Sequence, residues 1–222
     1  MTRTRTQFVQ SGEPAAFVAV LATVYFLAAA AAAHVVNTQY DFFRDYMSDY
    51  AVGSWGWIYA SAYWASFIGW VALAVALWQA APAAALSRTG VVLLVIVGIA
   101  SLLLFYFPTD ILPPGAPPTT NVGKIHLLAA VASWILFVIA APMISSRLCR
   151  SAYWAPWRRP LLILAWLATP LLAILVVVVA AKAPFGGLAE KAFILDRSLW
   201  ALLLGLLALK SARKSLADLS AK

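Results

Sequence analysis

Residues 90–107 read GVVLLVIVGIASLLLFYF and contain no charged side chain. A helix needs about 20 apolar residues to cross the hydrocarbon core of a bilayer. In lipid, every backbone N–H and C=O group must be paired within the segment, so this stretch predicts a transmembrane helix and not a strand. Five further stretches are comparably long and apolar, and together they predict an all-α bundle of six transmembrane helices. The predicted spans are 15–36, 54–79, 90–107, 122–144, 160–181 and 192–209.

The composition agrees with a polytopic membrane protein. Of the 222 residues, 64% are apolar and 11% are charged, whereas about 25% of the residues in a soluble domain are charged. Six crossings take about 120 residues and leave about 100 for loops and tails. We therefore expect one transmembrane domain over 1–222 and exclude a water-soluble enzyme. The Lys and Arg residues are scattered in pairs between apolar stretches, so membrane lipids are expected partners and nucleic acid is not.

The same basic residues predict the orientation, because cytoplasmic loops carry an excess of them. Eleven lie on one side of the predicted spans and four on the other, while Arg197 lies within the sixth span. We therefore expect both termini in the cytoplasm. The eleven are Arg3, Arg5, Arg88, Arg147, Arg150, Arg158, Arg159, Lys210, Arg213, Lys214 and Lys222, and the four are Arg44, Lys124, Lys182 and Lys191.

The first span has an alternative interpretation. Arg3 and Arg5 precede an apolar stretch, as in a cleavable secretion signal. That stretch is longer than the core of a signal, which usually has about 7 to 15 residues. A first transmembrane helix is therefore the favoured interpretation.

The acidic residues are distributed in the opposite way to the basic ones. Six of the eight lie on or just below the outer face, and both histidines, His34 and His126, lie at the same level. Acidic residues contribute little to topology, so insertion alone does not explain this split. The sequence therefore predicts a polar cluster at the extracytoplasmic face. Its acidic members are Asp41, Asp45, Asp49, Asp110, Glu190 and Asp196.

The segment 38–50 has a helical spacing of polar and aromatic residues. Asp41, Asp45 and Asp49 recur every four residues, and aromatic or Met side chains recur at intervals of three and four. This pattern predicts a short helix with a carboxylate face and an aromatic face. One interpretation is a helix that lies in the membrane interface. The other is a site where a cation, from Arg44, Arg197, Lys124 or a metal ion, sits against the acids.

The corner between the third and fourth spans predicts a second polar contact. Pro108 ends the third helix because proline cannot continue the hydrogen-bond ladder, and Thr120 or Asn121 can cap the fourth. We expect the loop to bring Asp110 close to His126. A carboxylate there would favour the imidazolium or orient a neutral ring for metal binding. The alternative is a structural hydrogen bond that ties the two helix ends together.

Arg197 is a charged residue within a predicted span. With the sixth span starting near residue 192, it would lie about 8 Å below the outer end. An Arg at that depth costs a few kcal/mol unless it reaches the interface or pairs with an acid. A pair with Glu190, seven residues earlier on nearly the same face, is the structural interpretation. A buried pair with Asp49 or Asp110 would instead mark a functional site.

Three motifs resemble a known family. They are Ser48-Asp49-Tyr50-Ala51-Val52-Gly53, Phe107-Pro108-Thr109-Asp110 and Gly123-Lys124-Ile125-His126. In combination they resemble the domain-of-unknown-function family 998 (DUF998), six-helix bacterial membrane proteins, and the likeness runs from the first span to the sixth. The resemblance implies the six-helix fold and a location in a bacterial cytoplasmic (inner) membrane, but no activity. It also implies recurring polar positions, which here are Ser48, Asp49, Asp110, Gly123 and His126, while the spacing of Glu190 and Arg197 is wider than the family pattern leads us to expect.

The leading hypothesis for function is a lipid-binding, sensing or accessory bundle without catalytic activity. Polar contacts between helices contribute about 0.6 kcal/mol each in membranes, so structure alone could retain several of these residues. An accessory role would imply a membrane-protein partner or a second copy of the chain. The residues expected to bind a ligand in this hypothesis are Ser48, Asp45, Lys124, Glu190 and Arg197.

Two alternatives assign chemistry to the polar cluster. The first is an intramembrane metal-dependent hydrolase or lipid-modifying enzyme, with Asp49, Asp110 and His126 as catalytic residues. Its zinc ligands would be His126, Asp110 and His34, with a carboxylate in place of the third histidine of similar multi-span hydrolases. The second is an electron-transfer protein in which His34 and His126 are the axial ligands of a haem b. A transporter is less well supported, because no inverted repeat is visible.

Overall fold

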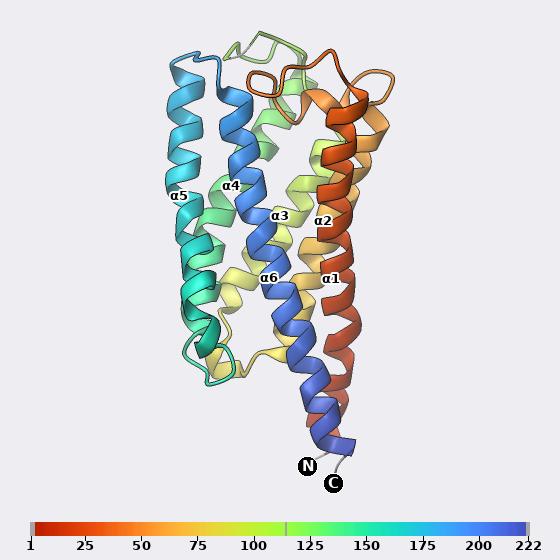
Figure 1. The fold of residues 1–222 in the computed structure, drawn as a ribbon, viewed down its shortest axis with the longest axis vertical. Coiled ribbons are helices and arrows are strands. Elements are labelled where there is room, and N and C mark those ends of the chain that lie inside the picture. The colour runs from red at the N-terminus through yellow and green to blue at the C-terminus, as the bar shows by residue number, and fades with distance from the viewer. Residues whose placement is uncertain (1–2, 114, 221–222) are drawn as a thin grey trace.

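The structure, a computed structural model, is a bundle of six long helices (Figure 1). It describes residues 3–113 and 115–220, and the side chains of 12–113 and 115–214. The helices are α1 (Arg3–Val36), α2 (Gly56–Ala80), α3 (Arg88–Tyr106), α4 (Asn121–Leu148), α5 (Arg158–Ala180) and α6 (Gly186–Ser220). Three short 3-10 helices are the other described elements, so the predicted all-α class is confirmed for the described residues. The side chains of Arg3, Arg5 and Lys222, which entered the count of basic residues, lie outside them.

All six helices are long and apolar enough to cross a membrane, which confirms the predicted number of spanning helices and makes the chain a multi-pass membrane protein. The largest difference that affects the polar cluster is in α6, which begins at Gly186 and not near residue 192. Hydropathy excluded this first part because Glu190 and Lys191 interrupt the apolar pattern. In the structure the helix continues through both residues, since their side chains bind the loop 37–55.

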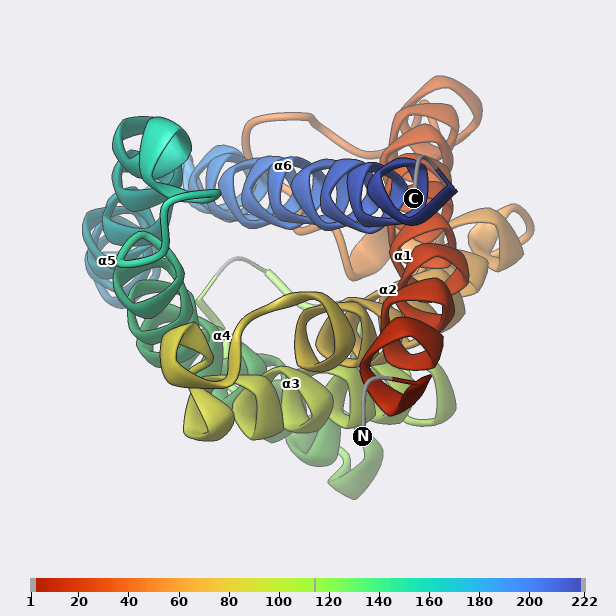
Figure 2. The same cartoon turned by 90° about the horizontal axis from the view of Figure 1, so that it is seen from below.

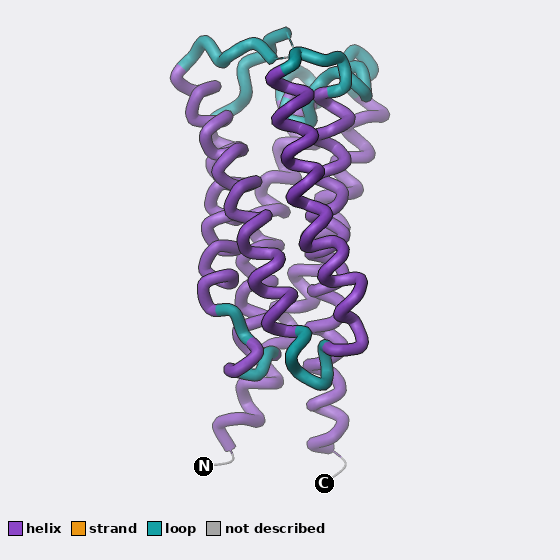
Figure 3. Tube along the Cα trace, turned by 90° about the vertical axis from the view of Figure 1, so that its left-hand side faces the viewer, coloured by secondary structure: helices purple, strands orange, loops and turns teal. Residues whose placement is uncertain are grey.

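The helices form a closed ring in chain order. Each helix packs against the next one along the chain, and α6 packs against α1 and also against α2 (Figure 2). The loops 37–55, 107–120 and 181–185 lie together at one end, and the described ends of the chain lie at the other with the loops 81–87 and 149–157 (Figures 1 and 3). Following the predicted orientation, we call these the outer end and the inner end.

Aromatic side chains from three helices fill the centre of the ring. Phe137 of α4 lies 5.6 Å from Trp70 of α2 and 5.5 Å from Trp200 of α6, measured between ring centroids, and Phe193 lies 6.2 Å from Phe137. All four side chains are at most 5% exposed. The indole N–H of Trp200 donates to Ser145 Oγ at 3.0 Å, so its one donor is satisfied. We call these four rings the aromatic plug, because they pack against one another at the centre of the bundle.

Glycines allow the helices around the plug to approach closely. A Cβ added to Gly69 of α2 would lie 3.3 Å from the Cβ of Ala22 in α1, and one added to Gly98 of α3 would lie 3.2 Å from the Cβ of Trp70. Small residues at such crossings are typical of helix packing in membranes, where van der Waals contact replaces the hydrophobic effect as the driving force. The close packing fixes α2 between its neighbours and holds its outer half against α6.

Candidate functional site

The loop 37–55 is a series of turns, so the helix predicted over 38–50 is wrong; the regular element there is the 3-10 helix Asp49–Ala51. The three aspartates cause the difference, because their side chains compete with the helix for backbone N–H groups. Asp41 accepts the N–H groups two and three residues ahead, both at 2.9 Å. Asp45 accepts the N–H four residues behind at 2.7 Å, and Asp49 accepts the one three residues behind at 2.9 Å.

The first turns of α6 hold this loop in place. Glu190, 5% exposed, accepts the N–H of Met47 at 2.6 Å. The ammonium group of Lys191 donates to the carbonyl of Asp45 at 2.6 Å and lies 5.3 Å from the ring centroid of Tyr50. Arg44 pairs with the Asp45 carboxylate at 2.9 Å. The cations that face the acids are therefore Arg44 and Lys191, and neither Arg197 nor Lys124 takes part.

Burial perturbs the acid at the centre of the loop. Asp49 is 8% exposed, and desolvation raises its pKa to about 6 despite the hydrogen bond from the N–H of Tyr46. Burial and the neighbouring carboxylates also raise the pKa of Tyr50 to about 12. Asp49 therefore stabilises its own loop by accepting a buried backbone N–H.

Asp110 holds the N-cap residue of α4 in place. Its carboxylate accepts the hydroxyl of Thr120 at 2.6 Å and the N–H groups of Thr119 and Thr120 at 2.8 and 2.9 Å, and these hydrogen bonds lower its pKa. The Thr120 hydroxyl in turn accepts the N–H of Gly123 at 2.9 Å, which confirms Thr120 as the N-cap. A Cβ on Gly123 would lie 2.5 Å from the Asp110 carboxylate. The two motifs of this corner are thus one structural unit, because the acid needs a glycine beneath it.

His126 does not share a hydrogen bond with Asp110. Its Nδ1 lies 2.7 Å from the carbonyl oxygen of Phe107, and since a carbonyl can only accept, Nδ1 is the donor. The neutral ring is then left with Nε2 as an acceptor. The side chain is 5% exposed and faces the interior beside Tyr63, with 6.3 Å between the ring centroids.

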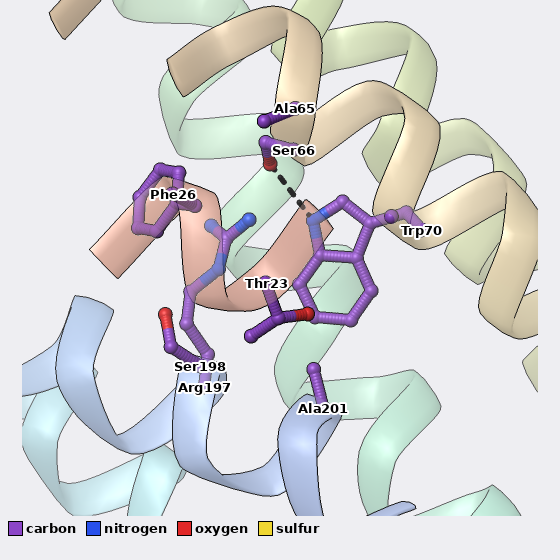
Figure 4. Close-up of a pocket in the computed structure, with 9 residues that line it drawn as sticks. Thr23, Phe26, Ala65, Ser66, Trp70, Arg197, Ser198 and Ala201 are labelled. Carbon is purple, nitrogen blue, oxygen red and sulfur yellow. Dashed lines mark hydrogen bonds between the residues drawn. The ribbon is translucent and has the colours of Figure 1, made fainter. Parts of the chain in front are cut away.

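Arg197 lies deeper than predicted and has no acidic partner. It is the eleventh residue after Gly186, which places it about 16 Å below the start of α6. The side chain is 7% exposed and makes no ion pair and no hydrogen bond with the described residues. Neither the predicted pair with Glu190 nor the pairs with Asp49 or Asp110 form. Its guanidinium instead lies 5.1 Å from the ring centroid of Trp70, one of the rings of the aromatic plug (Figure 4).

Arg197 lines two small cavities in the outer half of the bundle. One, of about 20 Å³, lies among α1, α2 and α6, where the guanidinium reaches between Phe26 and Trp70 (Figure 4). The other, of about 40 Å³, extends from Arg197 toward the outer end. A water molecule needs about 10 to 15 Å³, so both have room for water or a small ion. The polar side chains around the larger cavity are Ser48, Tyr59, Tyr63, Ser66, Ser101, His126, Glu190 and Arg197.

The hydrogen bonds around these cavities leave donors without acceptors. The indole N–H of Trp70 donates to Ser66 at 3.1 Å, Ser66 lies 3.0 Å from Ser101, and Ser101 donates to a backbone carbonyl at 3.1 Å, so both serines are satisfied. The hydroxyls of Tyr59 and Tyr63, by contrast, have no hydrogen bond with the described residues, like the guanidinium of Arg197. Three unpaired donor groups therefore line one cavity.

The structure brings together four of the predicted site residues and separates the rest. Ser48, His126, Glu190 and Arg197 line the larger cavity. Sequence reasoning missed Tyr59 and Tyr63, whose spacing of four residues near the outer end of α2 was the available signal. The predicted residues that do not line it are Asp45, Asp49, Asp110, Lys124 and His34, of which Lys124 is exposed.

The positions of the histidines and acids do not favour a metal site or a haem site. Among the described residues, no three His, Cys, Asp or Glu side chains lie close enough to hold a metal ion. His34 is bonded through Nδ1 to the carbonyl of Ala30 at 2.7 Å, and its ring lies 4.5 Å from that of Tyr50. It sits on α1, which is not among the helices packed against α4, the helix of His126. The residues present therefore do not fit a three-ligand zinc site or a haem held by both histidines.

Asp196 belongs to a different part of α6 from its neighbour in sequence. The side chain is 4% exposed, and both of its carboxylate oxygens are buried without a hydrogen-bond partner among the described residues. It does not line the cavities of Arg197. Successive residues of a helix point about 100° apart, so the buried acid and the buried base face different helices.

The closed ring of spanning helices and the polar cavity inside it define a multi-pass membrane protein with a buried charged site. The chain belongs to the family described as Protein of unknown function (DUF998), which matches residues 20–207. The match covers most of the chain and confirms the resemblance of its three motifs. No curated protein and no solved structure matches the chain.

Proposed function

We propose that this protein is a non-catalytic bundle of the bacterial cytoplasmic membrane that senses a small anion by binding it in the cavity of Arg197. The observation that carries the proposal is a buried guanidinium that has neither an acid nor a hydrogen-bond acceptor among the described residues, beside the unpaired hydroxyls of Tyr59 and Tyr63. The binding and sensing form of the leading hypothesis is thus the one we retain.

The chemistry of the donors favours an anion. A guanidinium carries five N–H donors and no acceptor and matches the two oxygens of a carboxylate. Each tyrosine adds an O–H, and the cavity of about 40 Å³ limits the ligand to the size of formate or chloride. Glu190 lies two helical turns before Arg197, about 10 Å along the axis, and its carboxylate accepts the N–H of Met47. It therefore lies at the far side of the cavity from the proposed anion.

A catalytic function has less support. Asp110 uses both carboxylate oxygens to bind Thr120, the N-cap of α4, and Asp49 accepts a backbone N–H of its own loop. Only His126 of the three predicted catalytic residues lines the cavity.

The proposed orientation, with both termini in the cytoplasm, rests on the excess of basic residues at the inner end, which is the pattern of cytoplasmic loops.

The test is the thermal stability of the purified protein when formate or chloride replaces gluconate at constant ionic strength. Gluconate is too large for the cavity and serves as the reference anion. A ligand that binds only the folded state at 100 times its dissociation constant adds about 2.7 kcal/mol of stability, so we expect the melting temperature to rise with formate or chloride. Arg197→Gln should abolish the rise, and Lys124→Gln, which removes an exposed cation at the outer end, should keep it.

Tyr59→Phe provides a second variant if Arg197→Gln fails to fold, because it removes one donor and keeps the ring. We expect it to weaken anion binding several-fold. A wild-type protein whose stability is the same in all three salts would overturn the proposal. So would an Arg197→Gln variant that folds and responds like the wild type.

A further inference from the structure

A groove at the inner end lies between the start of α3, the end of α4 and the side of α5. Its volume is about 570 Å³, within the range of roughly 300 to 1,000 Å³ that is typical of sites for organic ligands. The start of α3 and the end of α4 lie side by side there (Figure 2). Its lining includes Ser87, Arg88, Met143, Arg147, Arg150 and Trp166. The groove is at the opposite end of the bundle from Arg197.

The groove carries positive charge that the protein does not neutralise. Arg88, Arg147 and Arg150 are exposed and make no ion pair with the described residues. Glu13 is the one acid with a described side chain at the inner end, and it is paired with Arg213 at 2.8 Å. The N-terminus of α3 adds to the field, because the first N–H groups of a helix lack intrahelical acceptors and favour anions.

The lining changes from charged to apolar with depth. Arg147 is the last residue but one of α4, and Met143 lies four residues, or about 6 Å, farther into the bundle. Trp166 is eight residues after Arg158, the start of α5, which is about 12 Å along the helix. Both apolar side chains are exposed, Met143 to 36% and Trp166 to 58%. A free phosphate would use the arginines alone, whereas an amphiphile would cover the apolar wall as well.

We propose that this groove binds an anionic phospholipid. The phosphate and headgroup lie against Arg88, Arg147 and Arg150, and the upper part of an acyl chain lies along Met143 and Trp166. Guanidinium groups bind phosphate through paired charge-assisted hydrogen bonds, and basic pockets between transmembrane helices are suited to such headgroups. This site goes beyond the proposed function, because it lies at the other end of the bundle and takes a different ligand.

The test is native mass spectrometry of the detergent-solubilised protein with phosphatidylglycerol or phosphatidylcholine added. We expect the wild type to retain one phosphatidylglycerol at least ten-fold more strongly than phosphatidylcholine. The double variant Arg147→Gln/Arg150→Gln should lose this preference. Arg158→Gln/Arg159→Gln is the matched control, since it removes the same charge from exposed residues at the same end but outside the groove, and it should change the preference less than two-fold.

Two further measurements separate the lipid from other occupants. Trp166→Ala should weaken retention of phosphatidylglycerol several-fold, because it removes part of the apolar wall and no charge. Inorganic phosphate at millimolar concentration should leave lipid retention unchanged. Equal losses in the two double variants would overturn the proposal in favour of general surface charge, and full competition by phosphate would overturn it in favour of a free anion. All the variants change exposed side chains, so unchanged melting temperatures are expected and serve as the check on folding.

Discussion

Arg197 is a buried side chain whose N–H groups need hydrogen-bond acceptors from outside the protein. Insertion measurements assign a cost of about 2.5 to 3.5 kcal/mol to an Arg at the centre of a transmembrane helix. Its contacts with Trp70 and Phe137, at 5.1 and 5.7 Å, return roughly 0.5 to 2 kcal/mol each. The rings therefore offset much of the charge penalty but accept no hydrogen bonds in its plane. The N–H groups still need acceptors, and in the proposed function an anion in the adjoining cavity would supply them.

Asp49 leads to a prediction about pH. Because burial raises its pKa to about 6 from the ordinary value of 3.8, the folded state binds this proton more tightly than the unfolded state. The stabilisation is therefore complete below pH 4 and is lost as the pH rises through 6. A shift of about two pKa units corresponds to about 3 kcal/mol. We expect the melting temperature of the wild type, compared with that of Asp49→Asn, to fall between pH 4 and pH 6.

Asp49→Asn is a close control, because its amide oxygen can still accept the N–H of Tyr46. Both proteins carry the same remaining acids, so only the difference between their pH profiles reports on Asp49. Parallel profiles from pH 4 to pH 7 would show that the carboxylate is not desolvated in the folded protein.

At the level of elements, hydropathy was sufficient for the helices and insufficient for the turns. The six spans were predictable because an apolar stretch in lipid has few alternatives to a helix. The helix predicted over 38–50 was wrong because the spacing of its aspartates fits a helix, whereas their short side chains bind backbone N–H groups more effectively in turns. The start of α6 was misplaced for a related reason, since Glu190 and Lys191 bind a neighbouring loop that the sequence alone does not locate.

The candidate site was predictable in part. The sequence identified Ser48, His126, Glu190 and Arg197 because polar residues within or beside apolar spans are rare. It could not show that Asp110 binds the N-cap residue of α4, which depends on how the loop 107–120 folds back. The spacing of Tyr59 and Tyr63 was only a weak signal, because tyrosines are common near the ends of spans and packing decides which of them face the interior.

The cap of α4 gives a prediction at this scale. Gly123→Ala should destabilise the protein by about 2 kcal/mol, because the added Cβ would displace the Asp110 carboxylate and break its hydrogen bonds. In an Asp110→Ala background the same change should be neutral or stabilising, since alanine is about 1 kcal/mol better than glycine in a helix. Unfolding of the four proteins of this cycle measures the coupling. Equal effects of Gly123→Ala in both backgrounds would contradict the account.

The predicted orientation of the whole molecule in the membrane can be tested by labelling single cysteines. In a Cys149→Ser background, which removes the one native cysteine, Lys124→Cys places a thiol at the outer end and Lys214→Cys places one at the inner end. Both native lysines are exposed. We expect a membrane-impermeant maleimide added to intact spheroplasts to label only the first, and to label both after permeabilisation. The reverse pattern would invert the predicted topology and leave the fold unchanged.

The position of the aromatic plug determines how a signal could pass from one end of the bundle to the other. The rings are at most 5% exposed, and Trp70 also lines the smaller cavity of Arg197. Trp200 follows Arg197 by one turn on the same helix, and that helix is described as far as Ser220. The described part of α6 extends past the loops at the inner end (Figure 1), so a displacement of the guanidinium would move the inner part of this helix.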